Sequence, residues 1–234
     1  MQDYTAHPST YLPMSRIARV VIPGCPHHVV HRGNRGEPVF LEPPHRNVYR
    51  RFLRGYALAH GMRIWSYCLM TNHVHLIVVP DHEDSLALAI GYAHRHYAQW
   101  LNAKQEWTGH LWAGRYYSVP MDEPHLWMAT RYVETNPVRA NLVYRAQDYP
   151  WSSAEPHVSG RLDALLSADR PFPQGDWAAW LSEGLENEAL EAIRKSTHTG
   201  RPLGSPEFTE MVEEQIGRSL SPRKRGRPRK EKEQ

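Results

Sequence analysis

Two kinds of apolar pattern alternate along the first two thirds of the chain. β-Branched and apolar runs form four short segments, which predicts strands, and apolar residues recur at helical spacing in three longer segments, which predicts helices. The first strand contains Pro23 and Pro26, so we expect it to be bulged or to lie at a sheet edge. The predicted strands cover residues 17–34, 63–70, 73–79 and 115–121, and the predicted helices cover residues 44–60, 85–102 and 122–137.

The third predicted helix has a clear start and a clear end. Asp122 can cap its first turn, and Pro124 is tolerated there because the first N–H groups of a helix have no partner within it. A residue before proline avoids helical backbone, so Asn136, before Pro137, marks the end. The order of elements predicts an α+β fold. We expect an antiparallel sheet of the split βαβ type, ferredoxin- or RRM-like, with helices on one face.

The pattern predicts four regions along the chain. A flexible extension precedes the main domain, and an accessory region follows it with two short helices, the second of which Ser205 can cap. A basic tail ends the sequence and is too polar to fold alone. The four regions are residues 1–13, 14–155, 156–220 and 221–234.

Charge is unevenly distributed along the chain. The net charge is only +3, but residues 222–234 hold seven Lys or Arg and two Glu, a local +5, so the rest sums to −2. Residues 14–56 hold eight Arg and two acids, a local +6. Two basic zones on a nearly neutral body indicate a polyanionic partner.

Cysteine content and hydropathy bear on the compartment. Cys25 and Cys68 are the only cysteines and form no CxxC pair, which favours a reduced cytoplasmic protein. No apolar run approaches the ~20 residues that cross a bilayer, and the first residues do not read as a signal peptide. We therefore expect no membrane partner.

His73 and His75 lie two apart in an otherwise apolar strand. Alternate residues of a strand point to the same face, so we expect both imidazoles to project together with Ile77 while the residues between them pack on the opposite face. Such a pair suits a shared cation, although a metal needs further ligands. Two half-buried histidines bonded to backbone are the alternative, and the spacing alone leaves both open.

Tyr132 and Asn136 share a face of the third predicted helix because they are four residues apart. A tyrosine hydroxyl can act as a nucleophile and form a covalent intermediate, and an amide oxygen can complete a metal site. In the alternative interpretation, Tyr132 is a core residue and Asn136 ends the helix. Tyr116 and Tyr117 are rival nucleophiles on the last predicted strand.

Three segments together resemble the REP-associated tyrosine transposases, a branch of the single-tyrosine transposases in the HUH endonuclease group. They are "LMTNHVHLIVVP", "GHLWAGRYYSVPMDEPHL" and "TRYVETNPVRANLV", and the likeness covers about residues 14–155. It implies that His73 and His75 bind a divalent cation and that Tyr132 is the nucleophile. It also implies that Asn136 is a third ligand, where much of the wider group has glutamine.

The resemblance implies a metal-dependent DNA endonuclease and strand transferase. Tyr132 would attack single-stranded DNA, join covalently to the 5′-phosphate and release a 3′-hydroxyl, so that a second 3′-hydroxyl can reverse the step. The family implies Mg²⁺ or Mn²⁺, whereas the softness of two imidazoles alone would favour zinc. The implied substrate is hairpin-bearing single-stranded DNA with REP-like palindromes, which places the protein in the cytoplasm with the nucleoid.

Several basic side chains are candidates for DNA contact. Arg32, Asn34 and Arg35 lie in a loop after the first strand, where backbone phosphates or solvent are equally plausible neighbours. Arg115 begins the last strand. In the tail, Arg225 and Arg227 belong to an AT-hook-like "RGRP" that suits a narrow minor groove, although nonspecific attachment is favoured.

Two other functions remain as alternatives. One is a domesticated protein that binds DNA hairpins without cutting them, although the intact set of His73, His75 and Tyr132 favours the enzyme. The other is a zinc hydrolase, which is disfavoured because no nearby carboxylate is placed as a base. The protein is expected to act as a monomer or a homodimer.

Overall fold

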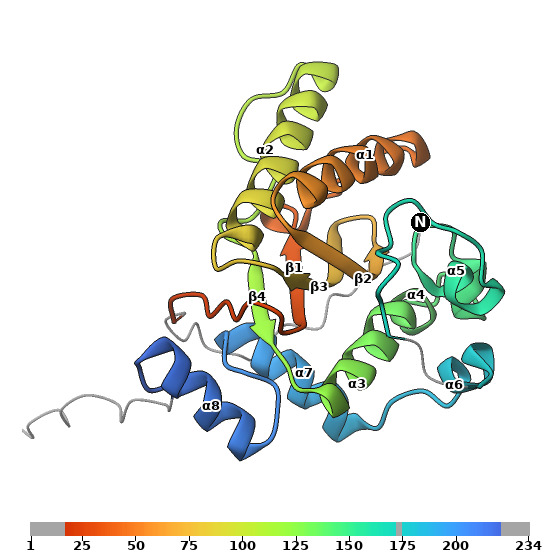
Figure 1. The fold of residues 1–234 in the computed structure, drawn as a ribbon. Coiled ribbons are helices and arrows are strands. Elements are labelled where there is room, and N and C mark those ends of the chain that lie inside the picture. Colours follow the sequence, from red (N-terminus) through yellow and green to blue (C-terminus); the bar gives the residue numbers. More distant parts are fainter. Residues whose placement is uncertain (1–16, 172–174, 221–234) are drawn as a thin grey trace, which may run out of the picture.

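The structure is a computed structural model that describes residues 17–171 and 175–220. The predicted N-terminal extension and the basic tail, with Arg225 and Arg227, lie outside the described residues. A four-stranded sheet forms the centre, and helices pack on it (Figure 1). Mixed α+β architecture with an antiparallel sheet was predicted and is confirmed.

All pairings in the sheet are antiparallel, and the strand order is β2-β3-β1-β4. The bounds are β1 His27–Arg32, β2 Met62–Leu69, β3 His73–Pro80 and β4 Tyr117–Pro120. The prediction of a bulged or edge strand over residues 17–34 is wrong, because the strand is shorter and lies inside the sheet. Pro23 and Pro26 flank a turn with Gly24 at φ 75°, so β1 begins only at His27 and lies between β3 and β4.

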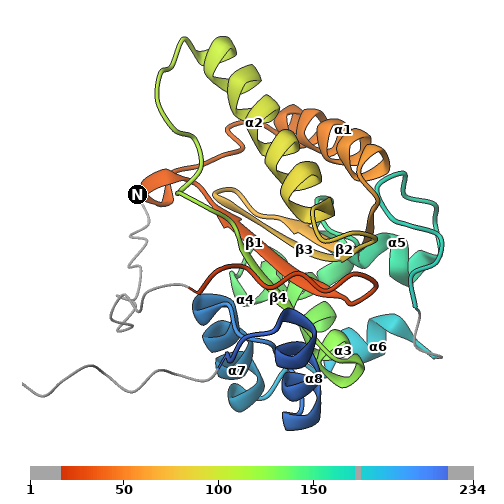
Figure 2. The same cartoon turned by 60° about the vertical axis from the view of Figure 1, so that its left-hand side comes forward.

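Helices cover both faces of the sheet, not one as expected (Figure 2). On one face lie α1, Pro43–Ala59, and α2, Ser85–Gln105, packed on side chains that include Leu76 and Val78 of β3. On the other face lie α3, Glu123–Glu134, and α7, Asn187–Thr199, packed around Ile77 and Val119. β3 is therefore buried on both sides, and the two apolar layers need separate helical covers.

The start of α3 is held by the predicted cap. The Asp122 side chain accepts a hydrogen bond of 3.1 Å from the backbone N–H of His125. The helix ends at Glu134, with Thr135 as its C-cap, before the expected Asn136-Pro137 break. A short helix, α4, Asn136–Arg139, follows and turns the chain back toward Tyr132.

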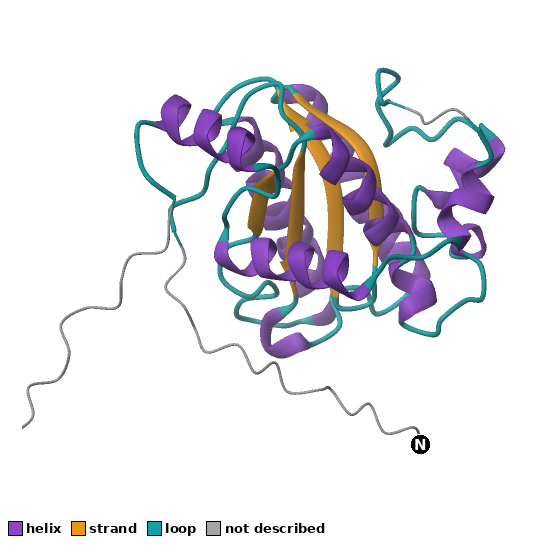
Figure 3. Ribbon diagram, turned by 90° about the horizontal axis from the view of Figure 1, so that it is seen from below, coloured by secondary structure: helices purple, strands orange, loops and turns teal. Residues whose placement is uncertain are grey.

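The C-terminal part of the chain packs against the sheet and the N-terminal segment through α7 and α8. Figure 3 shows the helices grouped around the four strands. Its helices are α5 Ala154–Ser159, α6 Trp177–Ser182, α7 and α8 Pro206–Ile216. Ser205 caps α8 as predicted, by accepting from the N–H of Phe208. Val212 of α8 packs on Val20 and Ile22 of the N-terminal segment. No helix in the described ranges is long and apolar enough to span a bilayer.

Candidate active site

His73 and His75 project from β3 toward α3. Their ring centroids are 4.9 Å apart, and His75 is only 4% exposed. Val74 and Leu76 belong to the apolar layer under α1 and α2, as the alternation predicts. The two imidazoles therefore share the sheet face that α3 covers.

Asn72 fixes the protonation of His73. The Asn72 side-chain amide donates to the backbone carbonyl of Gly36 at 2.9 Å, so its oxygen faces Nδ1 of His73, 2.6 Å away. An amide oxygen only accepts, so Nδ1 of His73 carries the proton. The Nε2 lone pair of His73 is then available to a cation, which is the arrangement of metal-binding histidines.

His28 of β1 orients His75 in a comparable way. Nε2 of His28 lies 2.9 Å from Nδ1 of His75, and Nδ1 of His28 lies 3.3 Å from the Thr197 hydroxyl on α7. If His75 donates from Nδ1 and His28 donates from Nδ1 to Thr197, all contacts are satisfied. This tautomer set leaves Nε2 of His75 with a free lone pair, as in His73.

The three imidazoles favour the neutral form. Burial lowers the pKa of His73 to about 3, and Arg32 adds to the effect. Burial, followed by Arg139, lowers the pKa of His28 to about 3. Burial also brings the pKa of His75 well below its ordinary value, and the neighbouring histidines and arginines contribute. Neutral imidazoles with free lone pairs fit a divalent cation.

Tyr132 lies beside this histidine group in the same chain. Its ring centroid is 5.6 Å from that of His75 and 5.9 Å from that of His28, both in edge-on geometry. α3 carries it, and the Asp122 cap and the apolar layer around Val133 fix that helix on the sheet. The two features that the sequence presents separately, the His-x-His strand and the helical tyrosine, are therefore adjacent.

The rival tyrosines lie elsewhere. Tyr116 is 6% exposed and packs in the layer under α1 and α2, on the opposite face of the sheet. Tyr117 begins β4 in the same cross-strand row as Val30 and His75, and its ring contacts His198 at 5.9 Å. The ring contact of Tyr132 with His75 is what favours Tyr132 as the candidate nucleophile.

Asn136 is buried at the start of α4, one helical turn after Tyr132. Within residues 17–171 and 175–220, no group of three or more His, Cys, Asp and Glu side chains is arranged to hold a metal ion. A cation bound by the two imidazole nitrogens of His73 and His75 would therefore need further ligands, and oxygen atoms could supply them. The Asn136 amide, DNA phosphate and water have that chemistry.

Comparisons with known proteins assign the family. A family model described as "Transposase IS200 like" matches residues 22–136. The chain belongs to the IS200-like transposases through residues 22–136. This confirms the recognition made from the three motifs.

One solved structure shares the fold of this transposase, and a second is similar over half of the chain. A REP-associated tyrosine transposase bound to a REP hairpin matches with a TM-score of 0.55 and 17% identity, over 70% of this chain and 97% of that chain. A candidate transposase from Deinococcus radiodurans matches with a TM-score of 0.36 and 19% identity, over 51% of this chain and 96% of that chain. No curated protein matches the sequence.

Sequence reasoning missed two residues at the candidate site. His28 contacts His75, and Arg139 lies with its guanidinium carbon 4.2 Å from the Tyr132 ring centre. Strand alternation predicts which residues of β1 share a face. It does not predict the register with β3, and that register brings His28 next to His75. Arg139 lies within "TRYVETNPVRANLV", yet only the turn after α3 directs it back to Tyr132.

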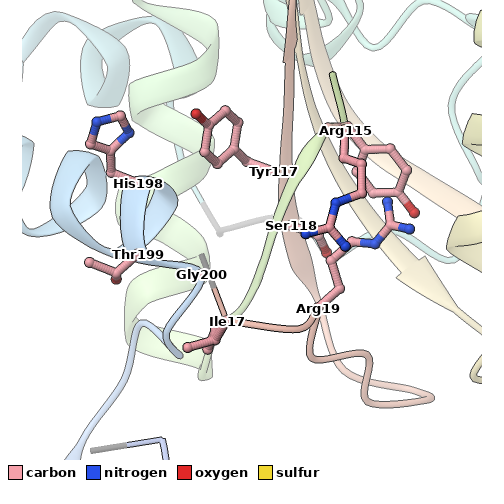
Figure 4. A pocket seen from close by; sticks show the side chains of 9 residues that line it. Ile17, Arg19, Arg115, Tyr117, Ser118, His198, Thr199 and Gly200 are labelled. Carbon is pink, nitrogen blue, oxygen red and sulfur yellow. The ribbon is translucent and has the colours of Figure 1, made fainter. Parts of the chain in front are cut away.

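The predicted DNA-contact residues fall into two groups. Arg32 ends β1 directly opposite His73 in the register, and Asn34 and Arg35 are exposed in the adjacent turn. This turn is fixed to the β2–β3 connection, because the N–H of Gly33 donates to the Asn72 carbonyl at 2.7 Å. A Cβ at Gly33 would lie 2.2 Å from the Glu37 carbonyl, so only glycine fits. Arg115 instead lies at the start of β4, near Arg19 (Figure 4).

Proposed function

We propose that this transposase cleaves and rejoins hairpin-bearing single-stranded DNA through a covalent bond between Tyr132 and a 5′-phosphate. The observation that carries the proposal is the 5.6 Å separation of the Tyr132 and His75 rings in one chain. A nucleophile and a cation must act on the same phosphate, and the short distance between the two rings supports these roles. The structural relative bound to a REP hairpin supports a hairpin substrate.

The reaction exchanges one phosphodiester bond for another. The Tyr132 oxygen attacks the phosphorus, the bond to the 3′-oxygen breaks, and the phenol proton passes to that leaving oxygen. A 3′-hydroxyl from another strand can reverse these changes and release Tyr132. The energy of the cleaved bond is retained in the phosphotyrosine, so no nucleotide cofactor is needed.

Each residue of the site has a proposed task. His73 and His75 would hold Mg²⁺ or Mn²⁺, with Asn136 as a candidate third ligand, and Asn72 and His28 would orient the two imidazoles. A cation held there would supply Lewis-acid polarisation of a phosphate oxygen and would offset developing negative charge. Arg139 fixes Tyr132 and places positive charge beside it. Arg32, Asn34 and Arg35 lie where backbone phosphates next to the cleaved bond would pass.

A denaturing gel tests the proposal. The protein is mixed with a library of labelled hairpin oligonucleotides with randomised single-stranded flanks, in Mg²⁺ or Mn²⁺, and adducts that migrate slowly are recovered and sequenced. We expect an adduct that disappears in Tyr132→Phe, in His75→Ala and after chelation, and that persists in Tyr117→Phe.

Other results would contradict the proposal. An adduct in Tyr132→Phe that is lost in Tyr117→Phe would move the nucleophile to β4. Tight hairpin binding without any adduct would make the protein a hairpin-binding protein that does not cut DNA.

A further inference from the structure

A cavity lies on the other side of the sheet from Tyr132. It has a volume of about 410 Å³. One wall is the face of α2 from Ala87 to Asn102, and the other is the loop of residues 109–116 that leads into β4. The volume matches that of small-ligand pockets, which run from about 300 to about 1,000 Å³.

The walls of this cavity carry positive charge. Arg19, Arg95 and Arg115 line it, and none of the described residues that line it is an aspartate or a glutamate. Arg95 and Arg115 are exposed, and Arg19 is half-buried, so the guanidinium groups are accessible to a ligand. Three arginines in the lining of one cavity favour an anion, and planar guanidinium suits phosphate.

Aromatic rings form the inner end of the cavity. Trp112 stacks on both His31 and His94, with ring centroids 4.8 Å and 4.4 Å apart. His94 is fixed in turn by the Tyr49 hydroxyl, 2.9 Å from Nε2, and Tyr116 completes the lining. Trp112 and Tyr116 are only 8% and 6% exposed, so they form a fixed apolar floor beside the arginines. An apolar floor beside cations suits a nucleotide, which carries an apolar base and an anionic phosphate.

A second hollow lies beside this cavity at the edge strand β4. This smaller hollow shares Arg19, Arg115 and Tyr116 with the cavity. Its other residues include Tyr117 and His198, which lie across β4 from Arg19 and Arg115 (Figure 4). His198 follows Thr197, the residue of α7 that contacts His28. The residues that line the two hollows thus reach from the α2 side to the helix that contacts the histidine group.

We propose that this cavity binds nucleotides of single-stranded DNA that continue beyond the segment held at Tyr132. The ligand is a DNA strand that passes the edge of β4, with phosphates near the three arginines and a base at the inner end of the cavity, which Trp112 and Tyr116 line. The inference extends the proposed function, since the strand is taken to be the substrate, but the cavity can be tested without cleavage.

Gly91 of α2 offers a variant that fills the cavity without disturbing the fold. It lines the cavity, and a Cβ added there meets no heavy atom within 4 Å. Leucine is also the better helix former, so Gly91→Leu is expected to fold. Gly55 of α1 is a matched control, because it is a helical, exposed glycine with equal space that lies away from the cavity.

The test measures how affinity depends on strand length. Labelled oligothymidylates from about 4 to about 16 nucleotides are titrated with each protein and followed by fluorescence anisotropy. We expect the native protein and Gly55→Leu to gain about tenfold in affinity with length, which corresponds to about 1.4 kcal/mol from the added contacts in the cavity. Gly91→Leu should lose this gain and bind the shortest strand normally.

A photochemical experiment locates the strand. Oligothymidylate with 5-iododeoxyuridine at successive positions is irradiated on the protein, and crosslinked peptides are identified by mass spectrometry. We expect a crosslink to Trp112 or Tyr116 at one position in the strand. Equal length dependence in Gly91→Leu and Gly55→Leu, or crosslinks confined to other residues, would overturn the proposal.

The outcome separates this proposal from the proposed function. The protein could show length-dependent binding that Gly91→Leu removes, yet form no adduct at Tyr132. That result would support DNA binding in the cavity and reject cleavage. An adduct at Tyr132 without length-dependent binding would support cleavage and reject the cavity. Competition by thymidine monophosphate with no effect of strand length would assign the cavity to free nucleotides and also reject the proposal.

Discussion

The guanidinium carbon of Arg139 lies 4.2 Å from the centre of the Tyr132 ring, and its Nη2 donates to the Tyr132 carbonyl at 2.7 Å. Nη1 of Arg139 donates to the Thr135 hydroxyl at 2.6 Å. Burial lowers the pKa of Arg139 from its usual value, and the phenol of Tyr132 partly offsets this. Arg139 thus fixes both the ring and the backbone of the proposed nucleophile.

Removal of Arg139 should slow adduct formation. We expect Arg139→Gln to reduce the rate about a hundredfold, the scale seen when one preorganised donor is lost from a catalytic site. The rate for Arg139→Lys should lie between those of Arg139→Gln and the native protein, because lysine keeps the charge but not the planar contact.

Single-turnover gels measure the rate of adduct formation. Arg145→Gln, which removes an exposed arginine, is the control. An unchanged rate in Arg139→Gln would exclude this role.

Loss of His28 should weaken metal binding. His28 contacts Nδ1 of His75 at 2.9 Å, and partners of this kind typically contribute 10- to 100-fold to metal affinity, so we expect a loss of about that size in His28→Phe. Calorimetric titration with Mn²⁺ measures it. His82→Ala, at an exposed histidine outside the site, should bind Mn²⁺ as the native protein does. Native affinity in His28→Phe would show that His75 needs no such partner.

The sequence predicts those parts of the site that depend on local geometry. His73 and His75 share a face because strand residues alternate, and Tyr132 and Asn136 share one because of the helical repeat. Neither relation depends on the rest of the fold. The resemblance then joined the two features, and the structure places the Tyr132 ring next to His75.

The contacts that the sequence did not predict depend on pairing between distant segments. His28 reaches His75 only through the register in which Val30 opposes His75. The expectation of helices on one face was wrong because a helical pattern does not say which side of a sheet is covered. The sequence of β3 does indicate helices on both faces. Ile77 and Val79 are apolar and lie on the same face as His75, so this face also needs helices to bury it.

Glu134 should anchor the helix that carries Tyr132. Its side chain is fully buried and accepts hydrogen bonds from Ser66 of β2, Ser153 and His157 near α5, and Trp177 of α6. We expect Glu134→Ala to lower the free energy of unfolding by about 3 kcal/mol, because several buried donors lose their partner.

Urea unfolding tests the role of Glu134, with adduct formation measured on the folded protein. Glu123→Ala removes an exposed carboxylate from the first turn of the same helix and should cost less than about 1 kcal/mol. If Glu134→Ala unfolds no more easily than Glu123→Ala, the four contacts do not hold α3 in place.

Acid should destabilise the protein through His27. Its Nδ1 donates to the Cys25 carbonyl at 2.8 Å, and its Nε2 accepts from the N–H of Ile22 at 3.2 Å, so both nitrogens are used by the neutral ring. Burial lowers the pKa of His27 to about 4, against about 6.5 in an unfolded chain. Between these values the unfolded chain binds more protons, so stability falls as pH falls from about 6.5 to about 4.

The size of this effect can be measured against a neutral substitute. At about pH 5, His27 alone should cost about 2 kcal/mol of stability relative to neutral pH. His27→Gln keeps a donor and an acceptor but cannot be protonated, so its stability should fall less between about pH 7.5 and about pH 5 in urea titrations. Other buried histidines, such as His94, contribute the remaining slope. Parallel pH profiles for the native protein and His27→Gln would mean that His27 is not protonated on unfolding in this range.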